Sequence, residues 1–147
     1  MRGISITVGP LATASANAIA QSQTPGAAGA LTLNGTLVNS QGVAVMDTPR
    51  MVLITTADST HAFTITGTNN SGDAITEVVP AFGAASASSV LSYATVTGVA
   101  INGAATAPVT VGTNGVATSP EAGTGIISGD GESYMFCLAS NVSISQG

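Results

Sequence analysis

The chain has 147 residues, a formal net charge of −5 and only 6% charged residues, whereas soluble domains carry about 25%. Its surface must therefore consist mostly of Ser, Thr, Asn, Gly and Ala side chains. Two basic side chains are too few to neutralise a phosphate backbone, and no apolar run approaches the roughly 18 residues of a membrane span. Neither a nucleic acid nor a membrane is an expected partner.

The pattern of apolar residues predicts an all-β chain. Val, Ile and Thr are frequent and alternate with polar residues over short runs, as in half-buried strands. Turn-forming residues recur about every 8 to 12 residues, which is typical of sandwiches and barrels. We therefore expect a β-sandwich or jelly roll of short antiparallel strands. The expected organisation is an extended N-terminal strand or arm over residues 1–30 and a single β-sandwich domain over residues 31–147.

The first thirty residues predict extended chain. Residues 4–8 (Ile-Ser-Ile-Thr-Val) alternate and end at Gly9-Pro10, and Ala alternates with polar residues from Leu11 onward. Ala alone would favour a helix. Two uses of this segment remain open, an arm that lies along a neighbouring subunit and a mobile terminus. No apolar run of signal-peptide length occurs at the start, so export by the general secretory route is not expected.

The next segment contains a predicted turn and a rigid corner. Asn34-Gly35 is a dipeptide typical of tight hairpins. Pro49 fixes its own backbone and favours an extended conformation for the residue before it, so a strand should begin at Arg50. Because Arg50 lies three residues after Asp47, we expect an ion pair that fixes this corner rather than a catalytic role for either residue.

Two hairpins are predicted in the middle of the chain, after a buried strand at residues 51–54. The first pairs residues 61–68 with residues 73–79 through an Asn-Asn-Ser-Gly turn. The second pairs residues 96–101 with residues 109–111 around Asn102-Gly103. Between the hairpins, residues 81–89 form a small-residue linker that is expected to cross the sandwich, with Phe82 as its anchor.

The last third of the chain is rich in Gly, Ser and Thr. Residues 123–131 look like a phosphate-binding loop at first sight, but the Lys of a P-loop is missing and no helix pattern follows, so a plain loop is expected. Residues 134–138 predict a closing strand and residues 141–144 a last one. Cys137 is the only cysteine and cannot form an intrachain disulfide, so we expect a buried, unreactive thiol.

Few groups could support catalysis. His61 is the only histidine, so a metal site would need carboxylates from other segments. A Ser-His-Asp triad would have to use His61 with Asp58 or Asp73, and no Gly-x-Ser-x-Gly motif is present. We expect His61 to be a surface residue at the start of a strand, with a local hydrogen bond to Asp58. No catalytic residue, metal site or cofactor is predicted.

The central module, about residues 45–113, resembles small virion proteins of tailed bacteriophages. The resemblance rests on Thr48-Pro-Arg50, Val52-Leu-Ile-Thr55, Phe63-Thr-Ile-Thr-Gly-Thr68, Ala74-Ile-Thr-Glu77, Thr95-Val-Thr97 and Val109-Thr-Val-Gly-Thr113. It implies a capsid decoration (cement) protein or another accessory virion protein, non-enzymatic and oligomeric. The N-terminal third and the Gly-rich tail depart from the pattern, which leaves the type of virion protein open.

The expected function is therefore structural. The chain should bind the major capsid protein on the outer surface of the virion and stabilise the shell, as a homotrimer assembled in the cytoplasm of the bacterial host. The residues expected to contact the capsid or another subunit are Ile4, Ile6, Val8 and Leu11. The alternatives are a head-to-tail or tail accessory protein and, in a different class, a carbohydrate-binding or adhesive β module.

Overall fold

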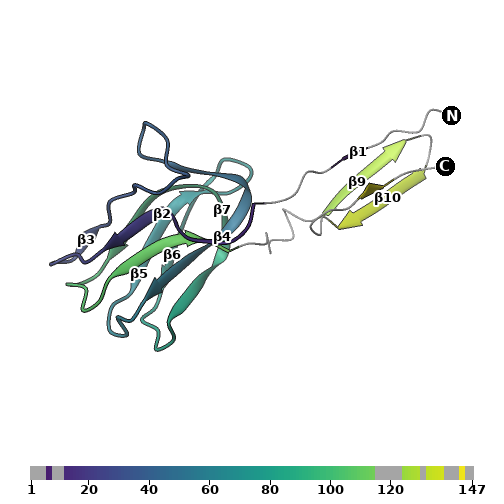
Figure 1. Ribbon diagram of the computed structural model, residues 1–147. Coiled ribbons are helices and arrows are strands. Elements are labelled where there is room, and N and C mark those ends of the chain that lie inside the picture. The colour runs from purple at the N-terminus through teal and green to yellow at the C-terminus, as the bar shows by residue number, and fades with distance from the viewer. Residues whose placement is uncertain (1–5, 8–11, 115–123, 130–131, 138–142, 145–147) are drawn as a thin grey trace.

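The computed structural model describes residues 6–7, 12–114, 124–129, 132–137 and 143–144 of the chain (Figure 1). These residues form antiparallel strands and contain no helix, which confirms the predicted all-β class. The strands are β1 (Ile6–Thr7), β2 (Ser15–Gln23), β3 (Gly29–Ala30), β4 (Ala44–Thr56), β5 (Phe63–Thr68), β6 (Ala74–Val79), β7 (Ser86–Ile101), β8 (Val109–Thr113), β9 (Thr124–Gly129), β10 (Glu132–Cys137) and β11 (Ser143–Ile144).

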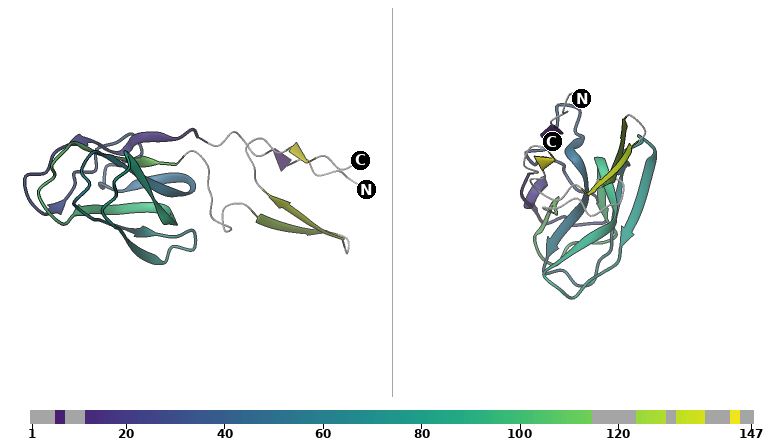
Figure 2. Two further views of the ribbon diagram at one scale, coloured as in Figure 1. Left: turned by 90° about the horizontal axis from the view of Figure 1, so that it is seen from below. Right: turned by 90° about the vertical axis from the view of Figure 1, so that its right-hand side faces the viewer.

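Seven of these strands form one hydrogen-bonded sheet that folds back on itself. The strand order is β2-β8-β4-β7-β5-β6, and β3 pairs with β7. The start of β7 pairs with the end of β4, whereas residues 95–101 of β7 pair with β5. Register shifts interrupt the β4–β7 pairing, and such bulges bend strands and let them pass from one layer to the other. The result is a two-layered sandwich (Figure 2).

The core lies between the two layers and is mostly β-branched. In β5 every second residue is buried, beginning with Phe63 and Ile65. Ile19 of β2 and Val111 of β8 come from the other layer and belong to the same apolar cluster. Phe82 packs its ring against Phe63, with 6.3 Å between the ring centroids, so the predicted anchor is in place. The predicted linker at residues 81–89 is shorter than expected, because β7 begins at Ser86.

Two turns share one geometry built on an asparagine and a left-handed glycine. In residues 39–43 the side-chain oxygen of Asn39 accepts hydrogen bonds from two backbone N–H groups, and Gly42 has a φ of 77°. In residues 69–73 Asn69 does the same and Gly72 has a φ of 86°. The second turn joins β5 to β6, which confirms the predicted central hairpin.

The second predicted hairpin, around Asn102-Gly103, is wrong. β7 and β8 lie on opposite sides of β4 and do not pair with each other. Residues 102–108 instead cross from one layer to the other. The N–H of Asn102 donates to the carbonyl of Ala62, and the N–H of Ala105 donates to that of Pro25. These long-range bonds override the local turn preference of the dipeptide.

Asn34-Gly35 does not form the predicted hairpin either. The N–H of Gly35 donates to the carbonyl of Ile19, and the N–H of Leu37 donates to that of Ala18. The side chain of Asn34 accepts the N–H of Gln21. Residues 31–38 therefore cover the outer edge of β2, because pairing with this edge satisfies more backbone groups than a local turn would.

The segment expected to form an N-terminal arm divides into two parts. β2 lies within the seven-stranded sheet, paired with β8, and its residue Ile19 is fully buried. Residues 1–5 and 8–11 lie outside the described residues. β1 pairs with β11 through Ile6 and Ile144, so segments from the two ends of the chain lie side by side.

The C-terminal segment contains a further hairpin. β10 includes most of the predicted closing strand, and β11 coincides with the end of the predicted last strand. The loop expected at residues 123–131 is partly wrong, because Thr124–Gly129 is the strand β9 and pairs with β10. Backbone pairing therefore outweighs the Gly-rich composition. The side chain of Cys137 lies outside the described residues.

Close contact between β2 and β8 yields a test of the sandwich. A methyl group at Gly112 would overlap the backbone carbonyl of Ser15, and the backbone cannot yield without separating the strands. We expect Gly112→Ala to lower the free energy of unfolding by about 3 kcal/mol. Gly83→Ala is the control, because nothing lies within 4 Å of the added carbon, and it should change stability by less than about 0.5 kcal/mol. Urea denaturation measures both, and equal effects would contradict the fold.

Candidate functional site

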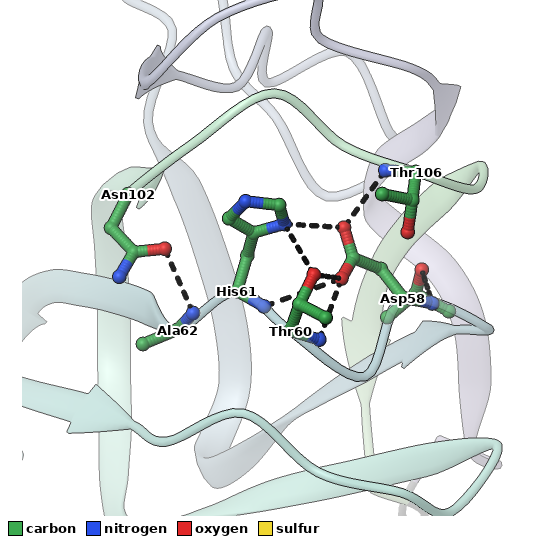
Figure 3. A network of polar contacts seen from close by, with 7 residues as sticks. Asp58, Thr60, His61, Ala62, Asn102 and Thr106 are labelled. Atoms are coloured by element: carbon green, nitrogen blue, oxygen red, sulfur yellow. Dashed lines mark hydrogen bonds and ion pairs between the residues drawn. The ribbon is translucent and has the colours of Figure 1, made fainter.

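The most concentrated polar site surrounds the carboxylate of Asp58, in the loop between β4 and β5 (Figure 3). Its Oδ1 accepts the backbone N–H of Thr60 at 2.9 Å, the hydroxyl of Thr60 at 2.8 Å and the N–H of His61 at 3.2 Å. Its Oδ2 accepts the N–H of Thr106 at 2.9 Å and lies 2.8 Å from Nδ1 of His61. The side chain of Asp58 is completely buried, so hydrogen bonds replace the water it has lost.

These donors keep Asp58 ionised. The N–H of Thr106 is the largest cause, and together with the donors on Thr60 and His61 it holds the pKa of Asp58 far below its ordinary value, against the opposing effect of burial. An ionised carboxylate only accepts hydrogen bonds. Nδ1 of His61 therefore carries the proton in this contact.

The arrangement resembles part of a catalytic triad but serves to join two loops. In a catalytic triad an acid orients the histidine ring, and acyl transfer also needs a nucleophile that is hydrogen-bonded to the other ring nitrogen. The ring hydrogen bonds of His61 in the described part of the chain go to Asp58 and Thr60. The ring also packs against Gly103, where an added methyl group would overlap it. Asp58 and His61 thus fix the β4–β5 loop against the β7–β8 loop.

The sequence predicted one half of this site. The hydrogen bond between Asp58 and His61 is confirmed. His61 lies two residues before β5 and its side chain is 23% exposed, so it is partly buried rather than the predicted surface residue at a strand start. The contact with Thr106 was missed because 48 residues separate it from Asp58. The sequence holds no local signal for the Thr106 contact. The one hint is that a buried carboxylate needs more hydrogen-bond donors than its own loop provides.

A second polar cluster confirms the predicted ion pair between Asp47 and Arg50. Nε of Arg50 lies 2.7 Å from Oδ1 of Asp47, and Nη2 lies 2.8 Å from Oδ2. This bidentate geometry is the strong form of the pair. Arg50 is 1% exposed, and its hydrogen bonds to Asp47 lower the pKa of that carboxyl to about 2.

The Asp47–Arg50 pair also holds both ends of the sandwich. Oδ2 of Asp47 accepts the N–H of Ala12, just before β2, at 3.1 Å. Nη1 of Arg50 donates to the carbonyl of Asn114, just after β8, at 3.0 Å. The chain therefore enters the sandwich at Ala12 and leaves it at Asn114 at one corner.

The predicted contact residues belong to the N-terminal segment. Ile4, Val8 and Leu11 lie outside the described residues. Ile6 lies in β1, and its backbone pairs with Ile144. Their role in binding a subunit or capsid stays a prediction.

The described surface is almost free of basic groups. Among residues 12–114, Arg50 is the one Lys or Arg, and it is buried. In the same region the large apolar side chains that are exposed are Val45, Val78, Val90 and Leu91. No three His, Cys, Asp or Glu side chains of the described residues gather as metal ligands. The described part also holds no helix of the length and apolar character that crossing a membrane requires.

Comparisons of the chain with protein-family models, with curated proteins and with solved structures found no match. Its function is therefore inferred from its own residues and from the resemblance of residues 45–113.

Removing the Asp58 carboxylate tests its role in joining the loops. Asp58→Ala leaves the N–H of Thr106 and the donors of Thr60 and His61 without their partner, and we expect the melting temperature to fall by about 5–10 °C. Asp73→Ala is the matched control, because that exposed side chain makes a single side-chain contact, at 3.3 Å. Faster amide exchange at Thr106 should accompany the loss. An unchanged rate at Thr106 would contradict the role.

The Asp47–Arg50 pair predicts a loss of stability in acid. The pKa of Asp47 is about 2 in the fold against an ordinary value of 3.8, so its contribution is complete above about pH 4 and is lost as the pH falls toward 2. Urea unfolding at a series of pH values should show this fall, with a shallower slope for Asp47→Asn. Parallel curves for the two proteins would contradict the assignment.

Proposed function

We propose that the chain is a non-enzymatic structural protein of a tailed-bacteriophage virion that binds the outer capsid surface and stabilises the shell. Its partners would be the major capsid protein and copies of itself, in a homotrimer. Assembly would take place in the host cytoplasm. The proposal combines the resemblance of residues 45–113 with the chemistry of the described surface.

The observation that carries the proposal is the burial of Arg50 in a chain with so few charges. Arg50 is 1% exposed, and each of its three guanidinium nitrogens donates a hydrogen bond, to Asp47 or to Asn114. Soluble proteins depend on charged, mixed surfaces to stay apart from their neighbours. A surface of hydroxyl, amide, methyl and backbone groups favours broad contact with another protein instead. Many weak contacts, repeated in each copy of an oligomer, give durable attachment.

The position of the Asp47–Arg50 pair supports attachment through the terminal segments. Ala12 and Asn114 are held at one corner, so the segments before and after the sandwich can act together on one partner surface. β-strand addition is the simplest mode for an alternating segment such as residues 4–8. Ile4, Ile6, Val8 and Leu11 remain the proposed contact residues.

The Asp58 site supports a structural role rather than an enzymatic one. Every donor around the Asp58 carboxylate serves to anchor a loop, and its lowered pKa makes it a poor proton acceptor at neutral pH. His61 is held by Asp58 on Nδ1, and the Cδ2–Nε2 side of its ring lies next to Gly103. The two residues therefore favour a rigid scaffold.

Two alternatives remain. A head-to-tail or tail accessory protein would use the same kind of surface at a single vertex. A carbohydrate-binding module would need exposed aromatic faces, and within residues 12–114 Phe63 and Tyr93 are fully buried while Phe82 packs against the core. The described aromatic residues therefore favour the virion role over sugar binding.

Copy number on reconstituted particles tests the proposal. Purified shells without the protein are mixed with it, and bound copies are counted by quantitative mass spectrometry. Attachment at many positions over the shell favours decoration, whereas about a dozen copies or fewer favours the neck or tail. Because only 6% of the residues in the chain are charged, binding should persist in about 1 M salt, where charges are screened within about 3 Å. No binding to any shell would overturn the proposal.

A further inference from the structure

The outer edge of β6 has unpaired backbone groups. β6 is the last strand in the sheet order and pairs on one side only, with β5. The N–H of Asn69 donates to the carbonyl of Asp73, and hydrogen-bonded pairs then recur at every second residue, at Ile75, Glu77 and Val79. The N–H and C=O groups of the residues between them point away from β5, and none has a partner within the described residues. These residues are Ala74, Thr76 and Val78.

This edge lacks the features that keep edges from pairing. Natural edges carry Lys, Pro, bulges or a covering loop. At the opposite end of the sheet, residues 31–38 cover β2. β6 has six residues without Lys, Pro or a register shift. Its one charged residue, Glu77, turns its carboxylate away from the edge to accept the N–H groups of Val90 and Leu91 at 2.7 and 2.8 Å.

Exposed apolar side chains gather beside the same edge. Glu77 holds the segment of β7 that contains Val90, which is 85% exposed, and Leu91, which is 40% exposed. Val78, the next residue of β6, is 59% exposed and points to the opposite face of the strand from Glu77. A strand added to β6 would extend this layer of the sandwich beside the segment.

We infer that β6 is a pairing edge for β6 of a second copy of this chain, antiparallel and with Thr76 opposite Thr76 of the other copy. In this register Ala74 faces Val78 of the second copy and Val78 faces its Ala74. All three residues then form hydrogen-bonded pairs, with two hydrogen bonds each. Every outward N–H and C=O group of the strand gains a partner.

The side chains fit this register and disfavour its neighbours. Thr opposite Thr is a favourable cross-strand pair, and Glu77 lies opposite Ile75 of the second copy, so like charges do not meet. Centring the pair on Glu77 would place Glu77 opposite Glu77 and Ala74 opposite Pro80, which has no N–H to donate. Centring it on Ile75 would place Val78 opposite Gly72, in the turn outside the strand. The Thr76 register alone satisfies the whole edge.

The contact is two-fold and isologous, so it is separate from any contact that closes a homotrimer. It stands without the capsid proposal, because it depends on the edge of β6 alone. In an assembly it would join copies from neighbouring oligomers.

Charge at the two-fold axis provides the test, because residue 76 meets its own copy. Sedimentation equilibrium of the wild type should show self-association of the 14.2 kDa chain in multiples of two. Thr76→Lys and Thr76→Glu should each abolish this pairing, because like charges meet across the axis. An equimolar mixture of the two variants should restore it, because opposite charges then meet.

Thr36→Lys is the matched control, since Thr36 is exposed on the segment that covers β2 at the other end of the sheet. It should associate as the wild type does. Circular dichroism and thermal melting of each variant verify the fold. A wild type that stays a single copy, a trimer that Thr76→Lys leaves unchanged, loss of pairing in Thr36→Lys, or a mixture that does not recover would each overturn the inference.

Discussion

The carboxylate of Asp58 holds together two of the connections between the layers of the sandwich. Residues 57–62 carry the chain from one layer to the other between β4 and β5, and residues 102–108 carry it back between β7 and β8. Asp58 belongs to the first connection and accepts the N–H of Thr106 in the second. A buried charge is tolerated only with a full set of partners. Each connection must therefore follow a path that brings its N–H donors to the Asp58 carboxylate.

The same principle governs the other buried ion. The Arg50 guanidinium is shielded from water but bonded to both oxygens of Asp47 and to the carbonyl of Asn114. In a chain with two basic residues, one of them serves to close the point where the sandwich begins and ends. The described surface is thus left without Lys or Arg, because Arg50, the one basic residue among residues 12–114, is buried.

The two ends of the seven-stranded sheet are treated differently. Backbone and side-chain bonds from residues 31–38 cover β2, whereas the carboxylate of Glu77 binds the neighbouring β7 segment and leaves β6 open. One edge is therefore closed within the chain and the other is available for association.

The sequence by itself determined the strands with clear alternation and the contacts between near neighbours. The β5–β6 hairpin, the Asp47–Arg50 pair and the Asp58–His61 contact all join residues close in the chain, where spacing and turn chemistry are sufficient. Asn34-Gly35 and Asn102-Gly103 have the dipeptide typical of a tight hairpin, yet their backbone N–H groups form hydrogen bonds with distant segments. Only the tertiary structure decided which strands became neighbours, because partners for β8, for the edge of β2 and for Asp58 come from segments that no local pattern identifies.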